Sequence, residues 1–150
     1  MPSRLKDFAT AVVAVVEPET SALTVAQLMR QHHIGALVVV DAVDKSKPVG
    51  IVTDRDLVLS LMAEGLDPTL FTAGDIMSIE LVVANVELDA MDAVQLMRTQ
   101  RVRRLVLVDD KGALAGIVTM EDLLELLTRE LANLAAGVIG ARDREFEYRH

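Results

Sequence analysis

The chain has 150 residues and a formal net charge of −8, and 51% of its residues are hydrophobic although only 3% are aromatic. This length suits one compact unit or two small halves that share a core, and the acidic balance argues against a binder of nucleic-acid backbones because like charges repel. The absence of cysteine excludes disulfides and thiolate chemistry. The core must be aliphatic, and the high apolar content indicates apolar surface that is covered in an oligomer.

The N-terminal region has no signal-peptide pattern, because its charged start is not followed by an apolar core of that type. The apolar run at 9–16 is too short to span a membrane and is soon closed by Glu17 and Pro18. We therefore expect a soluble, cytoplasmic protein.

The first half of the chain reads as strand, helix, strand, strand, helix. A β-branched run favours a strand, apolar residues at helical spacing follow a polar stretch, and Thr20 or Ser21 suits the N-cap of that helix. The expected elements are a strand at 11–16, a helix that stops near 34–35, strands at 37–40 and 49–52, and a helix from 54 to about 64.

The second half follows the same order. Asp89 suits the N-cap of its first helix, and Asp110-Lys111-Gly112 predicts a tight turn between two strands. The expected elements are a strand at 81–84, a helix to about 101–102, strands at 105–108 and 114–118, and a helix from 120 to about 136. We expect the segment 137–140, with its two glycines, to end that helix ahead of a charged tail.

The two halves also share residues. The segment Gly50-Ile51-Val52-Thr53-Asp54-Arg55-Asp56-Leu57 returns 66 residues later as Gly116-Ile117-Val118-Thr119-Met120-Glu121-Asp122-Leu123. The segments 27–30 and 37–41 return 68 residues later, so the length change falls in the loop before Gly50, where true structural repeats tolerate it. A tandem duplication explains this pattern. The strands are rich in valine without alternation, which predicts an α/β fold whose sheets are covered on both faces.

This order of elements, with Asp75-Ile76-Met77-Ser78 opening the second half, resembles a tandem pair of cystathionine-β-synthase-type (CBS) domains, often called a Bateman module. The opening motif is degraded in the first half, where Asp7-Phe8-Ala9-Thr10 stands in its place. The resemblance implies two β-α-β-β-α domains that pack through their sheets with pseudo-two-fold symmetry. We expect the first repeat at 7–66, a linker at 67–74, the second repeat at 75–131 and a helical, charged tail at 132–150.

The resemblance also implies a regulatory function. Modules of this family bind adenosine-containing ligands (AMP, ADP, ATP or S-adenosylmethionine) in clefts between their sheets, and they commonly pair into a flat homodimer. We expect a non-catalytic module that needs no cofactor and signals to a separate effector protein through a change of arrangement. The alternative is a ligand-free scaffold for dimerisation. An enzyme lacks support, since the sequence shows no nucleophile–base pair, no metal-ligand cluster and no glycine-rich phosphate loop.

Thr53 and Asp56, with their twins Thr119 and Asp122, are the first candidate ligand contacts. A carboxylate accepts hydrogen bonds from both hydroxyls of a ribose diol, and the start of a helix suits a phosphate. In proteins that this chain resembles, these residues contact the ribose. Thr-x-x-Asp is also close to a helix capping box, and the two roles are compatible.

Arg103 and Arg104 are candidates for a phosphate clamp, because guanidinium donates two parallel hydrogen bonds. The alternative is a solvated turn. The first half has Gly35 and Ala36 at these positions, so two unequal clefts are expected. In the family, the basic residue of one half approaches the nucleotide whose ribose the other half holds, which would bring Asp56 and the two arginines to one site.

Two sets of apolar residues could serve either packing or binding. Val15, Val16, Val82 and Val83 could line adenine slots or belong to the core. The second helix of each half carries an apolar stripe wider than one core face needs, which favours a homodimer interface over simple core packing. These stripes consist of Leu57, Val58, Leu61 and Met62, and of Leu123, Leu124, Leu127 and Leu131.

Overall fold

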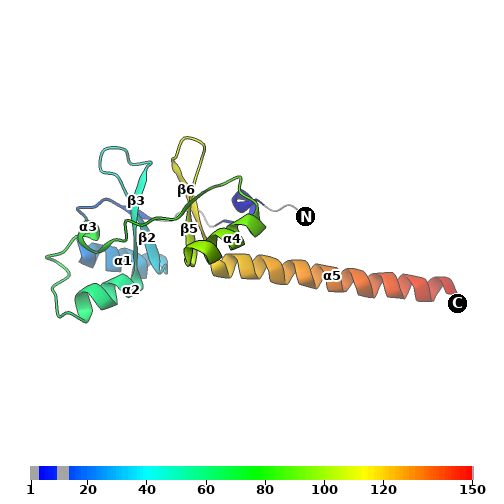
Figure 1. Cartoon of the computed structure of the whole chain (residues 1–150). Coiled ribbons are helices and arrows are strands. Elements are labelled where there is room, and N and C mark those ends of the chain that lie inside the picture. The colour runs from blue at the N-terminus through cyan, green and yellow to red at the C-terminus, as the bar shows by residue number, and fades with distance from the viewer. Residues whose placement is uncertain (1–3, 10–13, 150) are drawn as a thin grey trace.

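Two three-stranded sheets, one from each half of the chain, lie side by side at the centre of the molecule with helices on their outer sides (Figure 1). The computed structural model describes residues 4–9 and 14–149. In each sheet the first strand is parallel to the second, and the second is antiparallel to the third. The predicted order of elements and the predicted α/β class are thus confirmed.

The first sheet contains β1, β2 and β3, and helix α2 leads directly into a π-helical turn, η2. The predicted strand at 11–16 is described only from residue 14 onward, since 10–13 lie outside the described residues. The elements of this half, after a short 3₁₀ turn η1 at Leu5–Asp7, are β1 (Val15–Val16), α1 (Ala22–His32), β2 (Ala36–Val40), β3 (Pro48–Thr53), α2 (Asp54–Leu57) and η2 (Val58–Met62).

The second sheet repeats the first in detail. The strand register shifts between Val39 and Val40 in one sheet and between Leu107 and Val108, their counterparts, in the other. A shared irregularity of this kind supports a duplication more strongly than shared strands do. The elements are α3 (Ala73–Ile76), β4 (Val83–Asn85), α4 (Ala90–Gln100), β5 (Arg104–Val108), β6 (Leu114–Thr119) and α5 (Met120–Arg149).

Helices α1 and α4 begin and end through the same local chemistry. The side chain of Ser21 accepts a hydrogen bond from the Thr24 backbone, and the side chain of Asp89 accepts one from the Met91 backbone. Each helix ends at a residue with positive φ, His33 at 55° and Arg101 at 57°. The predicted N-cap Asp89 is confirmed, and of the two residues proposed for the first helix, Thr20 and Ser21, the N-cap is Ser21. The left-handed residues explain why both helices stop where the next strand must turn back.

The two sheets meet through aliphatic side chains. Val38 and Val40 of β2 and Val106 of β5 are buried in one cluster, with Leu81, Leu114 and Ile117 packed against it. The Leu114 amide also donates to the Ser46 carbonyl across the repeats, at 2.7 Å. Because α1 and α4 cover the opposite faces, the central strands are buried on both sides, as the lack of alternation predicted.

The opening segment of each repeat packs on the other repeat. Leu5 is fully buried in the core of the second repeat, and its amide donates to the Leu88 carbonyl at 2.9 Å. Ala73 of α3 is buried in the core of the first repeat, and its amide donates to the Thr20 carbonyl at 2.7 Å. The sequence repeat and the packing unit therefore do not coincide.

Ion pairs reinforce the N-terminal crossing. Lys6 and Arg4 contact Glu87 at 2.9 and 2.8 Å. The hydrogen bond from Lys6, together with the nearby charges, lowers the pKa of the Glu87 carboxyl. Because the folded state lowers this pKa, the contribution to stability is present above the unfolded pKa and is lost as the pH falls through the folded value.

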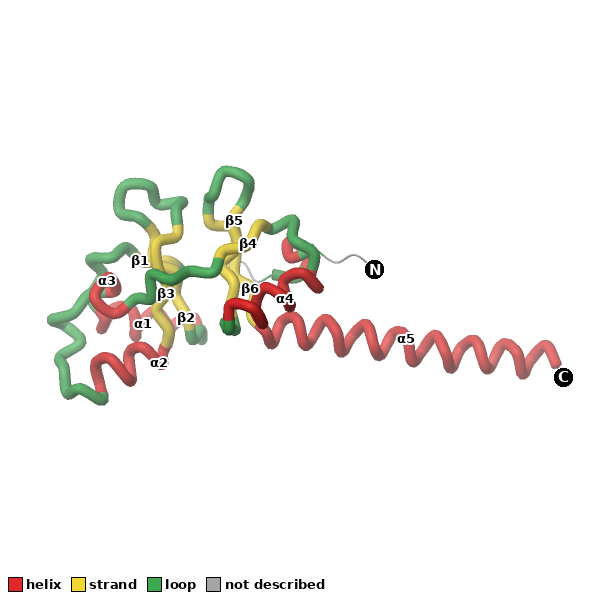
Figure 2. The backbone as a smooth tube through the Cα atoms, viewed as in Figure 1, coloured by secondary structure: helices red, strands yellow, loops and turns green. Residues whose placement is uncertain are grey.

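The predicted end of the last helix is wrong. Segment 137–140 does not stop it, and α5 continues as one helix from Met120 to Arg149 that leaves the body of the molecule (Figure 2). Glycine weakens a helix without removing a hydrogen bond, whereas proline removes one, and no proline follows Pro68. Long as α5 is, neither it nor any other helix in the described ranges is apolar enough to cross a membrane.

We predict that Leu5→Ala destabilises the whole fold, because Leu5 belongs to the opening segment of the first repeat yet fills the core of the second. The free energy of unfolding, measured by urea titration with circular dichroism, should fall by about 2–5 kcal/mol. Leu70→Ala, at an exposed position, is the matched control and should change it by less than about 0.5 kcal/mol. Equal effects of the two substitutions would show that the N-terminal segment is not part of that core.

Candidate functional site

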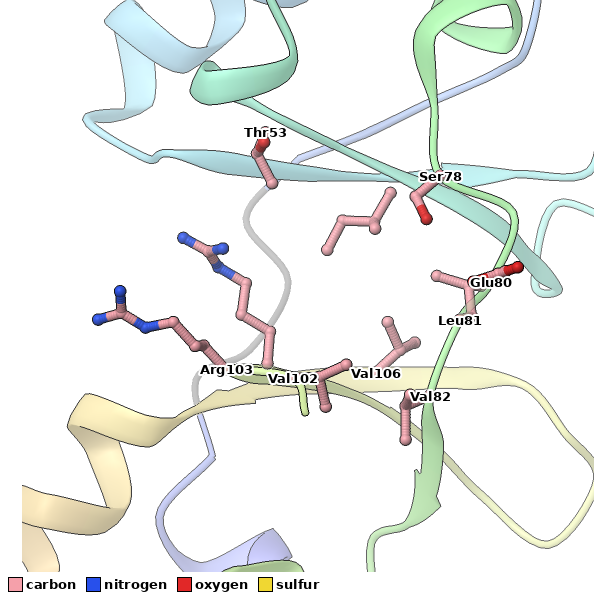
Figure 3. Close-up of a pocket in the computed structure, with 10 residues that line it drawn as sticks. Thr53, Ser78, Glu80, Leu81, Val82, Val102, Arg103 and Val106 are labelled. Atoms are coloured by element: carbon pink, nitrogen blue, oxygen red, sulfur yellow. The ribbon is translucent and has the colours of Figure 1, made fainter. Parts of the chain in front are cut away.

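A cavity of about 250 Å³ lies between the two repeats (Figure 3). One wall comes from β3, with Thr53 at its end, and the opposite wall comes from the start of β5. Ser78 and Glu80 lie at one end and Arg103 at the other. The full lining is Ile51, Thr53, Ser78, Glu80, Leu81, Val82, Val102, Arg103, Arg104 and Val106.

Thr53 is held by a capping box at the start of α2. Its hydroxyl oxygen accepts from the Asp56 amide at 3.2 Å, and its own amide donates to Asp56 Oδ2 at 2.8 Å. Thr119 and Asp122 make the same pair of bonds, at 3.1 and 2.9 Å. The capping alternative is thus confirmed for both pairs. Each carboxylate is half-buried and uses only Oδ2 within the described chain, so Oδ1 remains able to accept from a ligand.

A third capping box shows that the pattern alone does not make a site. Thr72 and Asp75 bond in the same way at the start of α3, at 3.2 and 2.8 Å. Of the three threonines, only Thr53 lines this cavity. What distinguishes Thr53 is the wall of the second repeat opposite it, which is a tertiary feature.

Arg103 and Arg104 meet Thr53 across the cavity. Arg104 pairs with Thr119 through the β5–β6 ladder, yet its side chain lines the cavity that Thr53 lines from the other repeat. This cross-repeat placement agrees with the arrangement that the family resemblance implies. Asp56 itself does not line the cavity and lies one hydrogen bond behind Thr53.

The two arginines differ in their partners. Arg103 Nη2 lies 2.6 Å from Glu121 Oε1, in an exposed ion pair. A backbone hydrogen bond and this arginine lower the pKa of the Glu121 carboxyl, which stays charged at neutral pH. Arg104 is half-exposed and forms no ion pair with any residue that the structure describes. Arg104 is therefore the guanidinium with more donors open to an anion.

Only one of the four candidate valines lines this cavity. Val82 does so, whereas Val83 and Val15 are exposed and Val16 is buried in the first core. Val15 and Val16 border a separate hollow on the first repeat. The repeat spacing of 68 residues makes Ala14, not Val15, the counterpart of Val82.

Sequence reasoning also missed part of the lining. Ser78 belongs to the recognised opening motif, but its place in the cavity comes from an isolated bridge to Ile51 of the other repeat. Such a bridge leaves no local pattern. Leu81, Val102 and Val106 complete the apolar lining and read in the sequence as ordinary core residues.

The second cleft, expected between Thr119 and Asp122 on one side and Gly35 and Ala36 on the other, remains a prediction. Ala36 pairs with Thr53 in the β2–β3 ladder, and the Gly35 carbonyl accepts from the Asp54 amide at 3.0 Å. They occupy the positions that Arg104 and Arg103 occupy in the second repeat. The repeat spacing assigns residues 10–14 to face Thr119 and Asp122, and 10–13 lie outside the described residues.

The chain matches the CBS domain family twice, at residues 5–63 and 73–129, and it belongs to that family. The CBS domain-containing protein YhcV of Bacillus subtilis is 38% identical over 135 residues, which are 90% of this chain and 91% of that protein. An uncharacterized protein of Methanopyrus kandleri is 41% identical over 109 residues, 73% of this chain. The match spans only 55% of that relative's length.

Solved structures show the same fold. Hypoxic Response Protein I, with two coordinated zinc ions, superposes with a TM-score of 0.70 at 32% identity, covering 82% of this chain and 98% of that one. CBSX2 in complex with AMP superposes with a TM-score of 0.69 at 28% identity, covering 84% and 96%. A hexameric CBS-CP12 protein from cyanobacteria reaches a TM-score of 0.74 at 27% identity, covering 83% and 71%.

We predict that Thr53→Val lowers the free energy of unfolding by about 0.5–2 kcal/mol, because it removes the hydroxyl that caps α2 while keeping the side-chain shape. Thr128→Val is the control, since that threonine is exposed on α5 and bonds only to the Leu124 carbonyl one turn back. Urea titration of both variants measures the free energy of unfolding. An unchanged stability for Thr53→Val would mean that the capping box adds nothing to the fold.

Proposed function

We propose that this protein is a non-catalytic regulatory module that binds an adenosine-containing ligand in the cavity between its repeats. The observation that carries the proposal is the convergence of Thr53 from one repeat and of Arg103 and Arg104 from the other on a single cavity. AMP, ADP, ATP and S-adenosylmethionine are the candidate ligands. The AMP bound by CBSX2, a protein of the same fold, supports this class of ligand.

Each part of a nucleotide finds a chemical match at the site. Thr53 suits one ribose hydroxyl, because its own hydroxyl can donate to it, and Oδ1 of Asp56, although outside the cavity lining, would accept from the other hydroxyl of a bound ribose. Arg104 suits the phosphate. The base would pack against Leu81, Val82 and Val106. The cavity is slightly smaller than the ~300 Å³ at the lower end for small-molecule pockets, so the phosphate would lie at the open, arginine-lined end.

The second cleft, with Thr119 and Asp122 facing Gly35 and Ala36, would accept an uncharged adenosine moiety or stay empty. Its first-repeat wall has no side chain able to bind a phosphate at these two positions. The two clefts would therefore differ in their response to nucleotide charge.

A ligand that contacts both repeats favours the relative orientation in which both contacts form. A homodimer would pass this shift to a separate effector protein. The ligand site and the effector-binding surface would then be energetically coupled. No resident cofactor enters this scheme, which relies on the regulatory ligand alone.

A ligand-free interaction scaffold is the alternative, and the exposed apolar side chains of α5 favour it. A thermal-shift screen separates the two functions, because a ligand that binds only the folded state raises its melting temperature. Failure of every adenosine compound to stabilise the protein at millimolar concentration would favour the scaffold. Native mass spectrometry of freshly purified protein would reveal a ligand carried through purification.

We predict that Arg104→Gln weakens AMP binding by about 10- to 100-fold, which corresponds to the loss of one charged hydrogen bond of about 1.5–3 kcal/mol. Arg101→Asn is the matched control, because Arg101 is exposed nearby, does not line the cavity, and has a positive φ that asparagine tolerates. Isothermal titration calorimetry measures the dissociation constant of AMP for each variant. Equal losses would place the phosphate elsewhere.

We further predict that Asp56→Ala and Asp122→Ala differ in their effects on AMP, ADP and ATP binding. Both variants lose the same cap, so a difference between them reports the ligand and not the fold. Asp56→Ala should weaken all three nucleotides, and Asp122→Ala should leave them nearly unchanged. Equal loss in separate titrations of the two variants would contradict the proposed asymmetry of the clefts.

A further inference from the structure

Helix α5 carries an apolar seam that its own chain does not cover. The C-terminal part of the helix projects away from the body (Figures 1 and 2), and Leu131 and Leu134 are 67% and 66% exposed. One set of these exposed residues recurs at alternating spacings of three and four, while Ile139 and Phe146 lie outside it. We call this set the heptad seam: Leu124, Leu127, Leu131, Leu134, Val138, Ala141, Glu145 and Tyr148.

This spacing is typical of coiled coils. The seam spans three and a half heptads, and six of its eight positions are aliphatic. A single helix in water gains little stability of its own, and most helices in proteins depend on a packed apolar face. Glycine is the least favourable residue other than proline in a helix interior. A Cβ built at Gly137 or Gly140 would have no heavy atom within 4 Å, so packing within this chain does not explain why glycine stands there. A helix with an uncovered apolar seam and two interior glycines would be stabilised by packing against a partner.

We propose that α5 pairs with α5 of a second copy of this chain, in an antiparallel coiled coil centred near residue 136. This inference goes beyond the ligand-binding function, which neither requires the helix pair nor fixes its direction. Leu134 would face the partner's Val138 and Leu131 the partner's Ala141. The residues that flank the seam, and one within it, decide between the two directions.

Charge favours the antiparallel direction. A parallel pair would place Glu145 against the partner's Glu145 within the seam, which is a like-charge contact. An antiparallel pair instead places Glu130 beside the partner's Arg144, and symmetry repeats that contact at the other end. Opposite charges at these flanking positions set the orientation of coiled coils.

The base of α5 offers a receptor for the partner's helix tip. An apolar groove of about 190 Å³ lies between α4 and α5, lined by Val94, Met97, Arg98, Met120, Leu123, Leu124 and Leu127. Antiparallel pairing brings the partner's Tyr148 opposite Leu124, at this groove. Tyr148 is the chain's one tyrosine and is 78% exposed. Arg98 borders the same groove, beside the expected position of the partner's Glu145.

The first test compares two neighbouring positions on α5. Val138 lies in the seam and is 52% exposed, and Ile139 lies outside the seam and is 57% exposed. By light scattering after size exclusion, the mass of the Val138→Glu variant should fall to half that of the wild type, whereas the mass of Ile139→Glu should not change. A single common mass for both variants would overturn the proposal, whether or not circular dichroism shows them folded.

The second test measures direction. The chain has no cysteine, so Glu147→Cys accepts one spin label per copy, at a position outside the seam. An antiparallel pair separates the two labelled residues by 22 helical positions, about 33 Å along the axis at 1.5 Å per residue, and pulsed electron resonance should report that distance. A distance below about 20 Å, the width of two packed helices with their labels, would show a parallel pair and overturn the proposed direction.

A charge exchange checks the same contact independently. Glu130→Arg and Arg144→Glu should each weaken the dimer at least fivefold by sedimentation, because each creates two like-charge contacts. The double variant should restore the wild-type dissociation constant. Additive losses in the double variant would show that these residues do not face each other.

Discussion

The contact between the two sheets determines how the core is closed and where the cavity lies. Val38 and Val40 of the first repeat and Val106 of the second form one buried aliphatic cluster. Because β2 and β5 are covered on both faces, neither repeat can bury its central strand alone. The same contact holds the end of β3 opposite the start of β5, and in this way Thr53 comes to share a cavity with Arg103 and Arg104. The cavity is a consequence of how the core is closed.

Local chemistry and tertiary position contribute separately to the site. The Thr-x-x-Asp box forms three times, at Thr53, Thr72 and Thr119, with hydrogen bonds of nearly the same length. A box of this kind starts a helix wherever it occurs. It becomes a candidate binding element only where a second wall stands opposite. Duplication supplies that wall, and later divergence, arginines in one repeat and Gly35 and Ala36 in the other, makes the walls unequal.

The features that could be predicted from the sequence are those that depend on residues close together in the chain or on the repeat itself. Ser21 and Asp89 mark helix starts through side-chain hydrogen bonds within three residues, and the repeat spacing locates each strand. The burial of Val16 and the exposure of Val83 depend instead on which face of a short edge strand each residue occupies, and a shift of one residue reverses that face. The length of α5 was mispredicted because glycine is a graded signal, weighed against the helix-forming residues around it. The packing of Leu5 on the second repeat joins residues far apart in the chain, so no local pattern reports it.

The crossing of the two opening segments bears on the ancestry of the fold. Each core is completed by a segment borrowed from its neighbour, Leu5 in one case and Ala73 in the other. A polypeptide with a single repeat would lack that last piece and could acquire it only from an identical molecule that gives its own in return. Gene duplication and fusion would then have converted a reciprocal exchange of segments between two identical chains into an exchange within one chain. The sequences of the two repeats could diverge from that point.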